Sequence, residues 1–366
     1  MRRSVAGLVA LGLLALAIAG CGASKTSSKK LTFDYANLTD NSALFSSFQQ
    51  SFVAGAKKLG ITFNTYNNNE SGTTALTNAR LMVASHPNVI FDYNVVAGLG
   101  ASLGSIFHKA GIRCVAVNIA APPCPLENLN NPGMGQLAAG VAVPYMRSHG
   151  WTGANTTVLF LQNATAGASV NIAVRTFYSD VASRVTGMTP MPASDIHAAT
   201  TTIGTTGIQV NAGGTLSSAH TAVADVLPGI ASTRHLVLFG INDDLVLGGW
   251  SAIQDAGRSS QAIVIGLGGA VPAMQQLRTN PHWIGEDIPF LPGWAEIGLA
   301  MGVALSRGYH LPATTYIPQT ILTKANVSHY YGSSNTTPKV LSALPPSDKY
   351  LIKTGVLQKF KNIPGV

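Results

Sequence analysis

The pentapeptide Gly100–Gly104 has the residue types and spacing of a nucleophilic serine motif. It reads Gly-Ala-Ser-Leu-Gly, and the Gly-x-Ser-x-Gly pattern presents a serine on a sharp turn between a strand and a helix. An exported esterase that uses Ser102 is therefore one hypothesis. Eight residues separate Ser102 from Tyr93, where an expected strand ends, and no His-Gly-Gly-Gly oxyanion segment occurs. We therefore expect the motif to lie within a helix, and we expect no catalytic residue and no enzyme activity.

Other signatures of cofactor chemistry are incomplete. The nine histidines and three cysteines do not have the spacing of metal ligands. The glycine-rich stretches Gly98–Gly100 and Gly266–Gly269 lack the full dinucleotide-binding fingerprint. The sequence thus predicts neither a metal site nor a nucleotide cofactor.

Residues 1–20 have the features of a lipoprotein signal peptide. Two arginines precede an apolar run from about Val5 to Ala17, and Ile18-Ala19-Gly20 places small residues before Cys21. We expect lipid attachment to Cys21 and a mature protein anchored outside the cytoplasm, in the periplasm or on the outer face of the cell membrane. An uncleaved anchor is the alternative, although Ser4–Gly20 is barely long enough to span hydrocarbon.

Cys114 and Cys124 are the two cysteines that remain once Cys21 carries lipid. Exported proteins normally pair such an isolated couple, so we expect a disulfide between them. Two unbonded, buried thiols are the alternative, because Cys114 opens an expected strand whose length could separate the sulfurs.

Composition predicts two domains with a largely neutral surface. About 345 residues remain after the signal, which is more than one ordinary core accommodates. Only 10% of residues are charged and 46% are hydrophobic, against roughly 25% charged in typical soluble proteins. Loss of Arg2 and Arg3 would lower the formal net charge from +8 to +6, and this dispersed excess does not indicate nucleic-acid binding. The C-terminal tail is basic, and we expect it to be solvated or to lie near anionic lipid.

After a linker at residues 21–30, short β-rich runs alternate with helix-length amphipathic segments. This pattern is typical of a parallel sheet covered on both faces. The expected strands are Leu31–Tyr35, Ile61–Tyr66, Val89–Tyr93, Cys114–Val117, Thr157–Leu161, Leu236–Phe239 and Ile263–Gly266. The expected helices are Phe45–Leu59, Asn171–Val185, Leu245–Ala256 and Ala270–Thr279. Two such arrays predict two Rossmann-like lobes, with the carboxyl ends of both sets of strands along one ligand-binding cleft.

Three patches of sequence occur in an order and spacing that are together fairly specific. They are Phe239–Asp244 followed by Leu247-Gly248, then Ile263–Gly266, and finally Leu291-Pro292 leading into Ile297-Gly298. Together they resemble the type I periplasmic binding proteins, in the ribose-binding branch of ABC-transporter solute receptors, and the similarity runs from about Leu31 to Thr323. The resemblance implies an α/β Venus-flytrap fold with parallel sheets. It also implies a three-strand hinge between the lobes, a monomeric protein and delivery of a small solute to an ABC permease in the membrane.

By the same resemblance, the chain crosses between lobes near Asn131, Phe290 and Pro318. This assigns residues 31–130 and 291–318 to the first lobe. Residues 131–290 and 319–366, including the basic tail, are assigned to the second lobe. A sensory protein that signals to a membrane receptor would have the same fold, and the sequence leaves this alternative open.

The resemblance also assigns ligand-binding positions, most of which depart from the family pattern. In the first loop Asn41 and the aromatic Phe45 are kept, and Asn242 of the second lobe is unchanged. Elsewhere charged or polar family residues are replaced, with Trp294 as a further aromatic near the hinge. The replaced positions are Asn94, Asn118, Asn171, Gly268 and Phe290.

These replacements bear on the chemistry of the ligand. Carboxylates and guanidinium groups bind sugar hydroxyls through charge-assisted hydrogen bonds, and amides and aromatic faces stand in their place here. We therefore expect a small neutral ligand, sugar-like or with a larger apolar face than ribose. A purely structural role is the alternative at each position, since Phe45 can belong to the core and asparagines after strands often satisfy turn backbone.

Overall fold

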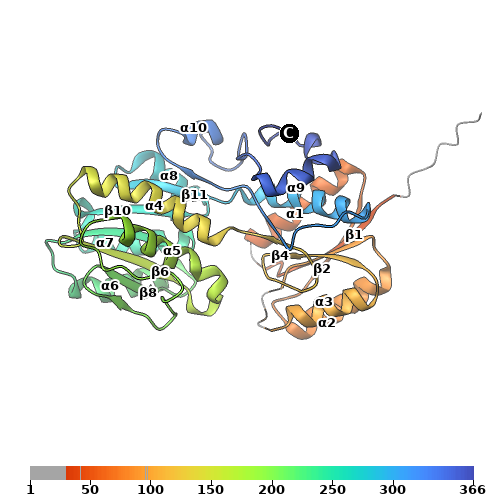
Figure 1. The fold of residues 1–366 in the computed structure, drawn as a ribbon, viewed down its shortest axis with the longest axis horizontal. Helices are drawn as coiled ribbons and strands as arrows, with labels where there is room; N and C mark the ends of the chain where they lie inside the picture. The colour runs from red at the N-terminus through yellow and green to blue at the C-terminus, as the bar shows by residue number, and fades with distance from the viewer. Residues whose placement is uncertain (1–29, 42, 95, 97) are drawn as a thin grey trace, which may run out of the picture. The chain divides into compact units, whose positions relative to one another are not determined.

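The computed structural model describes residues 30–41, 43–94, 96 and 98–366. These residues form an α/β fold with two mainly parallel sheets, one in each of two lobes (Figure 1). The expected signal peptide and Cys21 lie outside the described residues. Within the described part of the chain, no helix has the length and apolar character needed to cross a membrane.

The sheet of the first lobe is fully parallel, with strand order β12-β5-β4-β3-β1-β2. Helices α1 (Ala43–Leu59) and α9 (Leu291–Ser306) contact each other, and α2 (Gly72–Ser85) contacts α3 (Gly100–Lys109). Figure 1 shows these two pairs on opposite faces of the sheet. Its strands are β1 (Thr32–Asn37), β2 (Thr62–Asn67), β3 (Val89–Asp92), β4 (Arg113–Val117), β5 (Leu126–Asn128) and β12 (Thr314–Tyr316).

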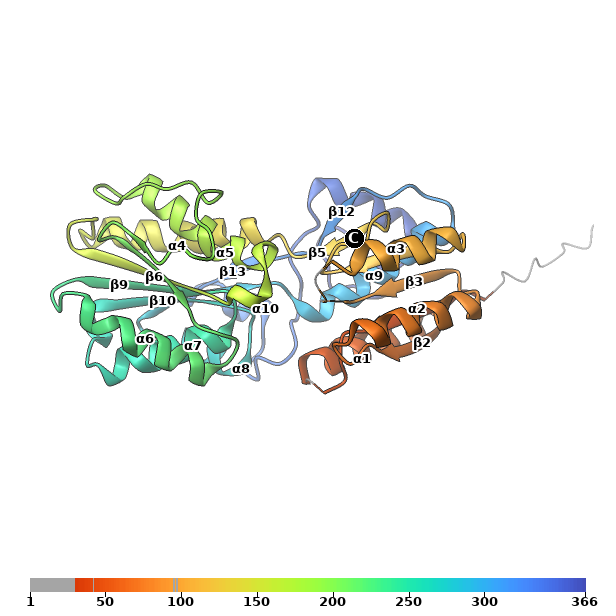
Figure 2. The same cartoon turned by 90° about the horizontal axis from the view of Figure 1, so that it is seen from below.

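The sheet of the second lobe has the order β13-β11-β10-β9-β6-β8-β7, and its two edge strands, β13 and β7, are antiparallel to their neighbours. Helices α4 (Asn131–Ser148) and α5 (Ala168–Arg184) cover one face, and α6 (Leu216–Val226) and α7 (Asp243–Asp255) cover the other (Figure 2). A further helix, α8 (Val271–Thr279), follows β10. The strands are β6 (Thr156–Gln162), β7 (Thr202–Ile203), β8 (Gly207–Asn211), β9 (His235–Gly240), β10 (Ala262–Leu267), β11 (Trp283–Ile288) and β13 (Thr320–Leu322).

Three connections lead from one lobe to the other: β5 to α4, β11 to α9, and β12 to β13. The residue limits of the two lobes remain predictions. The last helical turns of the chain, however, contact elements of the first lobe, although the resemblance assigns the chain end to the second lobe. The 3₁₀ helices η4 (Pro346–Thr354) and η5 (Leu357–Lys359) both contact α9, and η4 also contacts β12. The tail is not simply solvated, because Leu351 and Leu357 alternate with its lysines and are fully buried.

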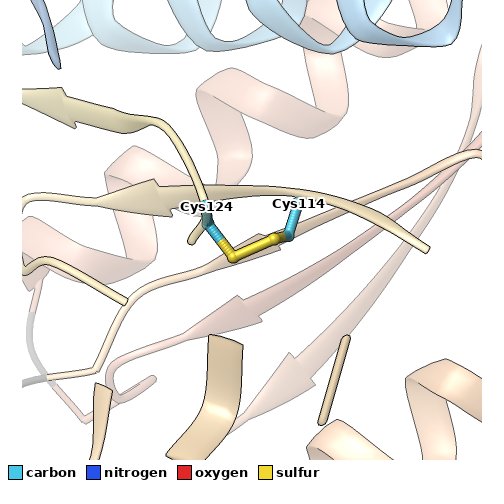
Figure 3. The surroundings of a disulfide bond; sticks show 2 residues. All are labelled: Cys114 and Cys124. Atoms are coloured by element: carbon cyan, nitrogen blue, oxygen red, sulfur yellow. A yellow bond between two sulfur atoms is a disulfide. The ribbon is translucent and has the colours of Figure 1, made fainter. Parts of the chain in front are cut away.

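Cys114 and Cys124 form a disulfide, which confirms the predicted pairing (Figure 3). Strand β5 runs parallel to β4 with Ala116 beside Leu126, and continuing this register by two residues places Cys124 beside Cys114. The strand therefore does not separate the sulfurs, as the alternative supposed. Closing a loop between residues ten positions apart stabilises the fold by roughly 2–3 kcal/mol on the chain-entropy model.

Candidate functional site

A cavity of about 450 Å³ lies at the carboxyl ends of β9 and β10. The loops after these two strands, the start of α9 and a segment near the C-terminus form its walls, with Ser47 of α1 also lining it. This is the edge of an α/β sheet at which ligands bind. Its polar lining includes Asn242, Asp243, Asp244, Tyr331, Asn335 and Thr336.

Asn242 is the N-cap residue of α7. Its Oδ1 accepts a hydrogen bond from the backbone N–H of Leu245 at 3.0 Å, which satisfies one of the open donors of the first helical turn. The Nδ2 amide hydrogens have no partner among the described residues. The cap therefore holds the side chain at the cavity while its NH₂ group remains available to a ligand.

Buried carboxyl groups shape the loop after β10. Asp243 accepts hydrogen bonds from the backbone N–H groups of Leu267 (3.0 Å) and Ala270 (2.6 Å), and Glu286 accepts one from Gly269 (3.1 Å). Burial raises the pKa of both carboxyls. A Cβ atom at Gly268 would lie only 2.8 Å from Oδ2 of Asp243, and Gly268 has φ +140°. A charged or polar side chain, which the resemblance implies at this position, is therefore sterically incompatible with the loop seen here.

The wall near the C-terminus was not anticipated from the sequence. Tyr331 packs in parallel on Phe290, with ring centroids 6.3 Å apart, so Phe290 reaches the site by supporting Tyr331. Phe290 itself is buried, with φ +46° at the N-cap of α9, an unusual conformation for a bulky residue. The adjacent Tyr330-Tyr331 pair was the available signal, but it lies beyond the region of family resemblance.

Three of the predicted site residues meet in the first lobe through two aromatics that were not predicted. The ring of Phe45 meets Tyr93 edge-on at 5.4 Å, and Nδ2 of Asn118 donates to the Tyr93 hydroxyl at 3.0 Å. Trp294 contacts Phe48 at 5.0 Å, and Phe48 in turn contacts Tyr93. Burial raises the pKa of Tyr93 to about 12, so its hydroxyl stays protonated at neutral pH.

Two of the predicted site residues in this region have a buried polar group without a partner in the described chain. Nδ2 of Asn94 is one, although its Oδ1 accepts from the Val96 N–H at 3.0 Å. Nε1 of Trp294 is the other. Asn41 differs from both, because it lies exposed in the loop between β1 and α1.

Several solved structures with a similar fold are solute-binding proteins of ABC transporters. No protein-family model and no curated protein matches the chain. An ABC transporter solute-binding protein from Mycobacterium smegmatis with bound glycerol aligns at TM-score 0.67 and 18% identity, over 84% of this chain and 98% of its own. A periplasmic ribose ABC transporter protein from Conexibacter woesei aligns at 0.67 and 13%, over 82% and 94%. A solute-binding protein from Bacillus halodurans with bound myo-inositol aligns at 0.65 and 13%, over 83% and 98%.

The chain has the fold of the ABC-transporter solute-binding proteins. This likeness bears out the predicted type I periplasmic binding protein fold with two α/β lobes. The cavity at the carboxyl ends of β9 and β10 is thus a candidate ligand site on a solute-binding-protein fold.

Asn171 contributes to the solute-binding-protein fold differently from Asn242. Its Nδ2 donates to the carbonyls of Asn163 (2.6 Å) and Gly167 (2.8 Å), and its Oδ1 accepts from the Asn163 N–H (3.0 Å). Both amide hydrogens are used within the loop after β6. The side chain therefore shapes this loop and offers no donor to a ligand.

The Gly-x-Ser-x-Gly motif lies within α3, as predicted. Cβ atoms at Gly100 and Gly104 would lie 2.1 Å from the carbonyl oxygen of Ala120 and 2.3 Å from that of Pro122. The two glycines thus let α3 pack closely on the segment between β4 and β5, and Ser102 is exposed. Within the described residues, no group of three or more His, Cys, Asp or Glu side chains is arranged to hold a metal ion.

Proposed function

We propose that this chain is an extracytoplasmic solute-binding lipoprotein that delivers a small neutral ligand, sugar-like or partly apolar, to an ABC permease. The lining of the cavity carries the proposal. Its volume of about 450 Å³ is within the usual range for small-molecule sites, roughly 300–1,000 Å³. None of the described residues that line it is Lys, Arg or His, whereas Asp243 and Asp244 are acidic.

This charge pattern indicates which class of ligand the cavity can bind. Phosphate and carboxylate groups are recognised by arginine, lysine or clustered backbone N–H groups, and the carboxylates of the lining would repel them. Amide, hydroxyl and apolar groups suit the hydroxyls and the C–H face of a sugar or polyol.

Binding is tested with the purified mature chain and a panel of neutral and charged probes. We expect at least one of glycerol, D-ribose, D-allose and myo-inositol to raise the melting temperature and to give a calorimetric binding isotherm. Ribose 5-phosphate serves as the anionic control and should do neither. Binding of the phosphate in preference to every neutral probe would contradict the proposal.

Ser102→Ala separates this function from the esterase hypothesis. Ser102 is exposed on α3, so the variant should bind the probes like the wild type. An ester-hydrolysing activity of the wild type that disappears in Ser102→Ala would instead support an enzyme.

Membrane attachment is proposed to depend on Cys21. Fatty-acid labelling in cells should mark the wild type and leave Cys21→Ala unlabelled and released from the membrane fraction. Cys114→Ala with Cys124→Ala is the matched control and should still be labelled. Equal labelling and equal membrane retention of Cys21→Ala would contradict lipid anchoring at this residue.

A further inference from the structure

We propose that the segment Tyr331–Thr336 determines ligand specificity, with the Tyr331 hydroxyl and the Asn335 amide donating hydrogen bonds to a polyhydroxylated ligand. The inference rests on the proposed function and adds a wall to the site that lies outside the region of family resemblance. Three residues of this segment line the cavity: Tyr331, Asn335 and Thr336.

The two donors belong to largely buried residues and have no partner within the described chain. Tyr331 is 5% exposed and Asn335 is 6% exposed, although both line the cavity. A Cβ atom built on Gly269 would lie 4.0 Å from the Tyr331 hydroxyl. The hydroxyl is therefore close to the loop after β10. It has no hydrogen-bond partner among the described residues. Because Tyr331 lines the cavity, a hydroxyl oxygen of a bound ligand can accept this hydrogen bond in place of water.

Asn335 presents its amide in the same way. Its Oδ1 accepts a hydrogen bond from Nε of Arg278 at 2.8 Å, and this contact fixes which end of the side chain carries the NH₂ group. The amide hydrogens have no partner in the described part of the chain. They form a second donor in the same wall as Tyr331.

Arg278 holds the segment in place from α8. Besides Asn335, its guanidinium donates to the backbone carbonyl of Gly332 at 3.0 Å and to that of Tyr331 at 3.4 Å. The Tyr331 ring packs on Phe290, and its backbone N–H bonds to the Val327 carbonyl at 2.9 Å. Groups fixed in this way lose little freedom when a ligand binds, so their hydrogen bonds contribute more to affinity.

The donors and acceptors of the cavity complement a polyol. Burial and the nearby Glu286 carboxyl raise the pKa of Tyr331 above its ordinary value, so the hydroxyl keeps its proton and donates. The exposed carboxylate of Asp244 lines the same cavity and offers acceptors. A sugar hydroxyl both donates and accepts, so one ligand can satisfy both kinds of group. An analogue without the hydroxyl would leave Tyr331 unpaired and would be rejected.

Three variants test this wall. Tyr331→Phe removes the hydroxyl and keeps the ring on Phe290, and Asn335→Asp removes the amide hydrogens and keeps the acceptor for Arg278. Tyr330→Phe is the matched control, since Tyr330 contacts Phe290 at 5.6 Å but does not line the cavity. Each variant is compared with the wild type by calorimetry with glycerol, D-ribose, D-allose and myo-inositol, and each is checked by thermal melting without a probe.

We expect Tyr331→Phe and Asn335→Asp each to weaken binding of the probes that the wild type binds by about 5- to 150-fold. The affinity of Tyr330→Phe for the probes should stay within about twofold of the wild-type affinity, because no hydrogen bond to the ligand is lost. If Asn335→Asp does not fold, the affinity of Tyr331→Phe alone decides whether the segment determines specificity.

The outcomes separate this inference from the proposed function. Wild-type affinity in both variants would overturn the inference while leaving the solute-binding function in place. Equal weakening by Tyr330→Phe would also overturn it, because loss of a hydroxyl that does not line the cavity would then have the same effect. A wild type that binds no neutral probe would overturn both.

Discussion

Asn242 and Asn171 show how one residue type performs two tasks on this fold. Both side chains lie at the start of a helix that follows a strand of the second sheet. Asn242 uses its oxygen to cap α7 and keeps its NH₂ group free of contacts with the described residues. Asn171 uses its oxygen and both amide hydrogens inside one loop. The distribution of hydrogen bonds, not the residue type, separates a ligand donor from a loop-shaping residue.

The substitutions Asn242→Ser and Asn171→Ala should therefore act on different properties. Serine keeps a cap acceptor, so Asn242→Ser should leave the free energy of unfolding within about 0.5 kcal/mol of the wild type. It should weaken binding of neutral probes by about 5- to 150-fold, because the amide donor is lost. Asn171→Ala should lower the free energy of unfolding by about 1–3 kcal/mol and leave affinity unchanged.

Urea denaturation and calorimetry measure the two properties separately. Unchanged affinity in folded Asn242→Ser would remove Asn242 from the ligand site. Weakened affinity in Asn171→Ala without loss of stability would return Asn171 to it.

At the scale of the elements, glycines in helices reveal which helix faces are in close contact. In α3, a Cβ atom at Gly104 would overlap the backbone oxygens of Pro122 and Ala121, at 2.3 and 2.4 Å. In α4, a Cβ atom at Gly140 would meet nothing within 4 Å. The first glycine is required by packing, whereas the second only weakens its helix.

Alanine at the two positions should thus have opposite effects. Gly104→Ala should lower the free energy of unfolding by on the order of 1–3 kcal/mol, because backbone must move to admit the methyl group. Gly140→Ala should raise it by about 0.5–1 kcal/mol through helix propensity. Paired urea denaturation curves measure both, and destabilisation of similar size in the two variants would refute the packing argument.

The elements that the sequence predicted are those with strong periodicity. The stripe from Phe45 to Leu59 coincides with α1, and Leu236–Phe239 and Ile263–Gly266 lie inside β9 and β10. Strands β5, β12 and β13 have three residues each, which is too short for a repeating pattern. Their pairing depends on neighbours far along the chain.

The residues of the candidate site likewise include some that the sequence could place and some that it could not. Asn242 could be placed because it lies two residues after a strand, and the carboxyl end of that strand fixes where its side chain lies. Tyr331 and Asn335 could not be placed. Their position depends on Arg278, which is 57 residues from Asn335 in the sequence and bonds to it only in the folded chain.

At the scale of the whole molecule, burial of carboxyl groups is the main electrostatic feature. Burial raises the pKa of seven carboxyls in the described chain, two of them, Asp92 and Glu296, to about 7. The others are Glu127, Asp243, Glu286, Asp287 and Asp348. An unfolded chain would release these protons near pH 4, so the folded state binds more protons between about pH 4 and pH 7.

This difference in proton binding predicts that the protein is more stable at pH 5.5 than at pH 8. Because the folded-state pKa values are raised, the stabilisation is present at low pH and is lost as pH rises through about 7. His235 acts in the opposite sense, since burial lowers its pKa, but it is one group against seven.

Asp92→Asn removes one contribution, so it should reduce the difference in unfolding free energy between pH 5.5 and pH 8 by about 1–2 kcal/mol. Asp225→Asn, at an exposed position on α6, should leave the difference unchanged. Urea denaturation at the two pH values measures it, and a wild type that is more stable at pH 8 would show that the buried carboxyls do not dominate.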